Sequence, residues 1–138
     1  MRHITGKPAT REEAWMRLLR YGGLWALLGY GFWCVRERDT GRFVGEVGLA
    51  DFHRDIDWGC DPECGWVLAP WAQGRGYATE AVTATLDWRD QRLPGSRTLC
   101  MISEENLASL RVAAKCGFRF VRDAEYHGPV KMFERVTA

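Results

Sequence analysis

The residues most able to do chemistry stand in one segment, 68–78, where an apolar run meets a glycine-rich turn and then a helical pattern. The turn reads Gln73-Gly74-Arg75-Gly76. The first N–H groups of a helix have no partner within the helix, and the helix dipole is positive there, so such a place can bind phosphate. Glycine also lets a pyrophosphate approach the backbone closely. The segment therefore predicts a site for a phosphate-bearing cofactor.

Three ligand classes compete for this turn. A Walker A loop needs a Lys-Ser/Thr pair after its last glycine, and the turn has none. A dinucleotide-binding fingerprint fits Gly74 and Gly76, but Thr79 stands where its third small residue belongs, and the turn follows an antiparallel hairpin. Coenzyme A is the third ligand.

The elements that must position the turn follow from local patterns. Before it, the capping box Thr10-Arg11-Glu12-Glu13 predicts a helix that buries Trp15, Leu18 and Leu19 and ends at Gly22-Gly23. Segments 30–37 and 42–52 read as a strand hairpin, and segment 64–69 as a short strand.

After the turn, a helix to about residue 90 should bury a stripe at helical spacing. A strand over 97–103, a helix that Asn106 caps and Gly117 stops, and a hairpin of 118–125 with 130–136 follow. The order predicts a single α/β domain over residues 1–138, with a mixed sheet covered by helices. The stripe consists of Ala78, Ala81, Val82, Thr85 and Leu86.

The spacing Gln73-x-x-Gly76-x-Ala78 matches the [Q/R]-x-x-G-x-[G/A] signature of the Gcn5-related N-acetyltransferases, the GNAT family. Asn106-x-x-Ser109, followed by Gly117-Phe118, is similar to the RimJ/RimL branch, and segments 63–68 and 76–81 resemble that branch too. The resemblance covers roughly residues 9–135. It implies a mostly antiparallel twisted sheet flanked by helices, whose fourth and fifth strands splay apart.

The resemblance also implies the binding residues for the cosubstrate acetyl-CoA. The turn would hold the pyrophosphate, the preceding strand would pair with the pantetheine arm, and Asn106 would contact the arm from the opposite side. Arg75, Arg111 and Lys115 are open alternatives for the 3′-phosphate. The turn residues are Gln73, Gly74, Arg75, Gly76, Tyr77 and Ala78, and the strand residues are Val67, Leu68 and Ala69.

The implied reaction is direct attack of a primary amine on the thioester. A backbone N–H near Val67 or Leu68 would stabilise the oxyanion, and Ser109 would assist departure of the thiolate, besides its contact with the cofactor. Glu63 and Glu46 are the candidate bases, acting through water. Each has a simpler alternative: Asn106 is a helix cap in any case, Ser109 is a small first-turn residue, and the two carboxylates are solvated.

The sequence departs from the family pattern at its start. Members begin with an R-L-x-L-R-x strand and a helix, and nothing before Thr10 has that form. We therefore expect the first strand and helix to be missing, either because the start was set late or because the fold has lost its first edge. The strand over 30–37 would then expose an edge, which a second copy could cover in a homodimer, through the sheet or through Trp15 and Leu19.

Composition limits the alternatives. The 138 residues have a net charge of +1, which argues against a nucleic-acid surface, and no apolar run approaches the roughly 18 residues of a membrane span. Five cysteines without a signal peptide favour reduced thiols in the cytoplasm. Cys60, Cys64 and His53 lack a second ligand pair, so we expect no metal.

The amine could be a protein N-terminus or a small molecule. A truncated acyl-CoA-binding module without turnover is the alternative function.

Overall fold

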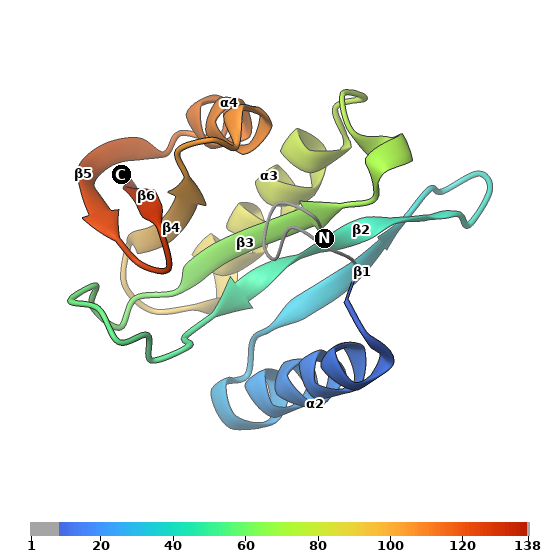
Figure 1. Ribbon diagram of the computed structural model, residues 1–138, viewed down its shortest axis with the longest axis horizontal. Helices are drawn as coiled ribbons and strands as arrows, with labels where there is room; N and C mark the ends of the chain where they lie inside the picture. The colour runs from blue at the N-terminus through green and yellow to red at the C-terminus, as the bar shows by residue number, and fades with distance from the viewer. Residues whose placement is uncertain (1–8, 138) are drawn as a thin grey trace.

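The computed structural model describes residues 9–137 and contains three α-helices, one short 3-10 helix and six strands in that range. The order along the chain alternates helices and strands after an initial helix and hairpin (Figure 1). The elements are α2 (Arg11–Leu28), β1 (Phe32–Arg36), β2 (Phe43–Ala50), β3 (Glu63–Leu68), η1 (Pro70–Ala72), α3 (Tyr77–Arg92), β4 (Arg97–Ser103), α4 (Leu107–Lys115), β5 (Arg119–Glu125) and β6 (Pro129–Val136).

The six strands form one sheet in the order β1-β2-β3-β4-β6-β5. All neighbours are antiparallel except β3 and β4, which run parallel and share a single residue pair, Glu63 with Leu99. From that pair the two strands diverge, so the sheet consists of two halves that meet at one end. This confirms the expected mixed sheet and the splay between its third and fourth described strands.

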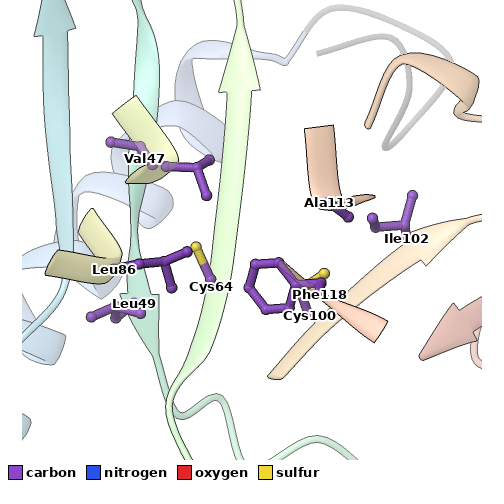
Figure 2. Close-up of a cluster of buried hydrophobic side chains, with 9 residues drawn as sticks. Val47, Leu49, Cys64, Leu86, Cys100, Ile102, Ala113 and Phe118 are labelled. Carbon is purple, nitrogen blue, oxygen red and sulfur yellow. The ribbon is translucent and has the colours of Figure 1, made fainter. Parts of the chain in front are cut away.

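Helices α3 and α4 cover the same face of the sheet and join its two halves. Val82 and Leu86 of α3 pack with Val47 and Leu49 of β2, while Ala113 of α4 packs with Cys100 and Ile102 of β4. Figure 2 shows Cys64 of β3 facing the ring of Phe118, with Val47, Leu49 and Leu86 on the left and Ile102 and Ala113 on the right. The predicted stripe of α3 is confirmed, because Val82, Thr85 and Leu86 are buried and the two alanines are half-buried.

Helix α2 differs from the sequence expectation in length and in orientation. Its predicted stop at Gly22-Gly23 is wrong, because the helix continues to Leu28 and only Gly29, at φ 77°, takes the left-handed conformation that ends it. The predicted inner face is also wrong, since Trp15, Leu18 and Leu19 are 56%, 61% and 49% exposed. The second half of the helix makes the sheet contacts instead, and Leu24 is its buried residue.

Strand β1 lies at an edge of the sheet within the described part of the chain. The indole N–H of Trp25 in α2 donates to the carbonyl oxygen of Phe32 at 3.0 Å, which satisfies one outward-facing backbone group of that edge. The first described element is a helix, as expected. The expectation that residues 1 to 9 form no strand falls, apart from Ala9, outside the described residues.

One buried cation fixes the end of α3 against the start of β4. Arg89 is 1% exposed, and its guanidinium donates to the hydroxyl of Thr98 at 2.8 Å. It also donates to four carbonyl oxygens beyond the helix, where the negative end of the helix dipole favours a positive charge. These carbonyls belong to Leu93, Pro94, Gly95 and Arg97.

We predict that Arg89→Met lowers the free energy of unfolding by about 3 kcal/mol, because buried acceptors would lose their donors. Urea denaturation measures the change. Arg92→Met is the matched control on the same helix: Arg92 is exposed and contacts the ring of Trp88 at 5.5 Å, so its loss should cost less than about 1 kcal/mol. Equal midpoints for the two variants would show that the Arg89 contacts do not stabilise the fold.

Candidate acetyl-CoA site

The glycine-rich turn has the backbone that phosphate binding requires. Gly74 and Gly76 have φ angles of 75° and 83°, in the left-handed region that other residues rarely adopt. A Cβ atom at either glycine would meet no described heavy atom within 4 Å. Glycine is therefore favoured here by the left-handed backbone conformation and by the space it leaves for a ligand, and not by crowding from other protein atoms.

The start of α3 lacks a side-chain cap. Thr10 caps α2 and Asn106 caps α4, each with a side-chain oxygen, but Gly76 has no side chain to cap α3. The first-turn N–H groups of α3 are therefore available to an anion. Gln73, Arg75 and Gly76 are exposed at this place, and Tyr77 and Ala78 are half-buried.

Two arginines beside the turn both contact the ring of one tryptophan, Trp71. The guanidinium carbon of Arg42 lies 3.7 Å from the ring centroid of Trp71, and that of Arg75 lies 5.6 Å away. Arg75 also donates to the backbone oxygen of Trp71 at 3.1 Å. The arrangement places two positive charges beside the uncapped helix. Sequence reasoning named Arg75 and missed Arg42, whose position depends on the β1–β2 hairpin folding back onto Trp71.

The backbone of β3 presents alternate residues to the gap. Ala69 N–H donates to Val44 of β2 at 2.8 Å, and hydrogen bonds in an antiparallel pair recur at every second residue. Val67 and Ala69 therefore face β2, whereas Trp66 and Leu68 face the side from which β4 has diverged. Of the two backbone donors that the sequence left open for the oxyanion, this register favours Leu68.

A side-chain donor near the gap is also unpaired. The indole nitrogen of Trp66 is buried and has no hydrogen-bond partner among the described residues. The ring lies 6.5 Å from that of Phe118, between the two halves of the sheet. An elongated ligand that carries amide groups fits a gap with unpaired backbone and indole groups, because it can supply the missing partners.

Helix α4 borders the gap on the β4 side. Asn106 accepts from the backbone N–H of Ser109 at 3.2 Å, which confirms the predicted cap and leaves the amide NH₂ without an acceptor in the described chain. Ser109 is half-buried in the first turn. The thiol of Cys116 lies 3.9 Å from Thr79 O and Thr83 Oγ1, so α4 is seated against the first turns of α3.

The two candidate bases have different partners. Glu63 is 7% exposed, and both of its oxygens accept from the guanidinium of Arg54 at 2.9–3.2 Å. Both oxygens are thus occupied by the guanidinium, and this geometry opposes a role as base. Glu46 is half-buried on β2, opposite Val67, and accepts from the hydroxyl of Tyr21 at 2.9 Å. Sequence reasoning missed Arg54 and Tyr21, because no local pattern links them to the two glutamates.

The cysteines are free thiols, and several are shielded. Burial raises the pKa values of Cys64, Cys100 and Cys116, so their thiolates are scarce near neutral pH. Within residues 9–137, no three His, Cys, Asp or Glu side chains gather as metal ligands. No helix in that range is both long and apolar enough to cross a membrane.

Comparison with known proteins gives a consistent assignment. The sequence profile of the acetyltransferase (GNAT) domain matches residues 1–119. The Bacillus subtilis protein YkkB is 31% identical over 110 residues, which are 78% of this chain and 63% of YkkB. The chain thus spans less than two thirds of that curated relative.

Two solved structures share the fold. A Bordetella pertussis protein named for the GnaT family of acetyltransferases is 32% identical, with a TM-score of 0.88 over 96% of this chain and 81% of that one. An acetyltransferase from Agrobacterium tumefaciens is 25% identical, with a TM-score of 0.79 over 96% of this chain and 75% of that one. The profile covers more than half of the chain, and the splayed sheet, glycine turn and uncapped helix agree with it. This chain belongs to the GNAT family of acetyltransferases.

Proposed function

We propose that this protein is an N-acetyltransferase that transfers acetyl from acetyl-CoA to a primary amine by direct attack. The observation that carries the proposal is the divergence of β3 from β4 beside the uncapped start of α3. The strand edge at Trp66 and Leu68 fits a pantetheine arm that binds like an added strand. The turn through Gly74 and Gly76 fits a pyrophosphate.

A structural neighbour supports the choice of cosubstrate. The Salmonella typhimurium acetyltransferase yncA, solved with its cofactor acetyl-CoA, has a TM-score of 0.71 and 22% identity over 88% of this chain and 72% of that one. That likeness concerns the fold. The local features of the turn and gap are what support acetyl-CoA as the cosubstrate of this chain.

Each residue of the site then has a distinct task. Acetyl-CoA supplies an activated thioester carbonyl. The N–H of Leu68 donates to the oxygen on which charge develops, where a preorganised donor is most effective. Glu46 accepts the proton that the amine loses, directly or through water, and the hydroxyl of Ser109 donates to the departing sulfur. The products are an amide and free coenzyme A.

The acceptor and the branch are finer proposals. The pattern of Asn106, Ser109 and Gly117-Phe118 favours the RimJ/RimL-like branch. The fold neighbours include a ribosomal-protein-S5-alanine acetyltransferase from Vibrio fischeri (22% identity, TM-score 0.72, 94% of this chain and 76% of that one). They also include a spermidine N-acetyltransferase from Vibrio cholerae (20% identity, TM-score 0.70, 90% and 76%). We therefore propose a protein N-terminus or a small amine as the acceptor.

Location and assembly follow as proposals from the same sequence features. Unpaired thiols at all five cysteines favour the reducing cytoplasm. The homodimer also stays a prediction. The exposed Trp15, Leu18 and Leu19 of α2 and the outer edge of β1 are the surfaces that a second copy would cover.

The first prediction tests the turn. Gly76→Val should weaken binding of coenzyme A at least tenfold by calorimetry, because valine opposes a φ of 83° and its side chain would project at the approaching phosphate. Gly29→Val is the matched control. Gly29 has a φ of 77° and open space at its Cβ position, but it ends α2. Equal losses of affinity in the two variants, or none in Gly76→Val, would refute the assignment.

The second prediction tests direct attack and separates an enzyme from a binding module. Acetyl-CoA should release free thiol only when a suitable primary amine is present, and the intact mass of the protein should not change. Burial makes the thiols of Cys64, Cys100 and Cys116 poor nucleophiles, and the exposed Cys34 and Cys60 stand outside the glycine-rich turn and the β3 edge. We therefore expect no acetyl-cysteine. A stoichiometric adduct that passes to an amine would overturn direct attack. Tight binding without thiol release across a broad amine panel would favour the module.

The third prediction concerns Ser109. Ser109→Ala should lower kcat by tenfold or more and leave the affinity for acetyl-CoA within about twofold, because its hydrogen bond to sulfur would strengthen in the transition state. Stopped-flow turnover and calorimetry measure the two quantities. Ser103→Ala, at the end of β4, is the serine control, and it should retain full turnover. An unchanged kcat in Ser109→Ala would leave that serine as a helix residue.

A further inference from the structure

Helix α2 is held to the sheet by a small number of aromatic contacts. The ring of Tyr21 stacks on that of Phe32 with centroids 4.6 Å apart and an interplanar angle of 6°. Trp25, one turn further along, meets Trp33 edge-on at 5.1 Å. Since the first half of the helix is largely exposed, these contacts fix where α2 lies.

Two glycines determine the position of Phe32. A Cβ atom on Gly48 would come within 2.8 Å of the Phe32 ring, and one on Gly65 would come within 3.1 Å. The ring therefore lies flat across β2 and β3 at places where any other residue would displace it. The Tyr21 ring stacks on Phe32, so its position also depends on Gly48 and Gly65.

The stacked ring brings the Tyr21 hydroxyl to Glu46. The hydroxyl donates to Oε2 of Glu46 at 2.9 Å, on the sheet face opposite α3. Burial and the nearby carboxylate raise the pKa of Tyr21, while Arg17 and Arg20 of the same helix act in the opposite direction. The phenol thus stays protonated wherever amines react with thioesters, and it acts as a constant donor to the carboxylate.

A neutral donor and a cationic donor have different consequences for a carboxylate. The guanidinium of Arg54 donates to both oxygens of Glu63, so neither oxygen is open toward an amine. The phenol of Tyr21 orients one oxygen of Glu46 without a full opposing charge, and the other oxygen can still receive a proton. Of the two glutamates, only Glu46 is both oriented and able to accept.

We infer that Tyr21 is a positioning residue, which holds the Glu46 carboxylate toward the acceptor amine and makes α2 a working part of the active site. The inference rests on the proposed acetyl transfer. The inference agrees with Glu46 as the base. It also explains what Gly48 and Gly65 contribute to the reaction: they let the Phe32 ring lie where it supports Tyr21.

The test compares two conservative variants of α2. Tyr21→Phe keeps the stacked ring and removes the hydroxyl, and should lower kcat/KM for the amine about tenfold while calorimetric affinity for acetyl-CoA stays the same. The loss should appear in kcat, while KM for the amine changes little, because the hydroxyl acts on the carboxylate rather than on the bound amine. Trp15→Phe changes an aromatic ring of the same helix that is 56% exposed, and it should not change the rate by more than twofold.

A double-variant cycle shows whether Tyr21 acts through Glu46. Glu46→Gln should lower kcat/KM by a hundredfold or more, and adding Tyr21→Phe to it should cause no further loss. Equal rate losses in Tyr21→Phe and Trp15→Phe, additive losses in the double variant, or full activity in Glu46→Gln would each overturn the inference. If Tyr21→Phe failed to fold, full activity in Glu46→Gln would still overturn the inference.

The same experiment distinguishes failure of the inference from failure of the proposed function. An unaltered protein that acetylates no amine would refute the function, and the inference with it. An active protein whose Tyr21→Phe variant matches it in kcat and KM would refute the inference alone.

Discussion

The structure depends on one constraint: β3 and β4 run side by side in the same sheet but share a single residue pair. Beyond Glu63 and Leu99 the backbone groups of Trp66 and Leu68 have no strand opposite them. A buried strand edge is costly unless something pairs with it, and an elongated ligand with amide groups can do so. The gap thus leaves backbone groups of the sheet unpaired, and a bound ligand can offset that cost by pairing with them.

Because the strands separate, other contacts must join the two halves. Phe118 and Cys64 pack between them, and α3 and α4 bridge the same face. At the joined end, Arg54 binds Glu63, and Arg97 reaches both Asp61 and Glu134. Side chains therefore join the two halves of the sheet at the start of β3, and the strands are apart at its C-terminal end. The glycine turn follows that end of β3, so it lies beside the gap.

Sequence reasoning succeeded where local backbone geometry restricts the type of residue. The turn at Gly74 and Gly76 and the cap at Asn106 were predictable because helix termini and left-handed φ angles restrict residue types locally. It failed for α2, where apolar Trp15 and Leu19 suggested an inner face that the fold leaves exposed. The partners of Glu63 and Glu46 were also beyond reach, since Arg54 and Tyr21 meet them only through tertiary packing.

The Arg89 contacts have a consequence for the order of folding. All of its acceptors lie within nine residues of it along the chain, so closing this cluster costs the entropy of a short loop only. These local contacts can fix the angle between α3 and β4 without any contribution from strands that are distant in the sequence. The same local contacts fix the direction in which β4 begins, and β4 then leaves β3 after the single pair of Glu63 with Leu99.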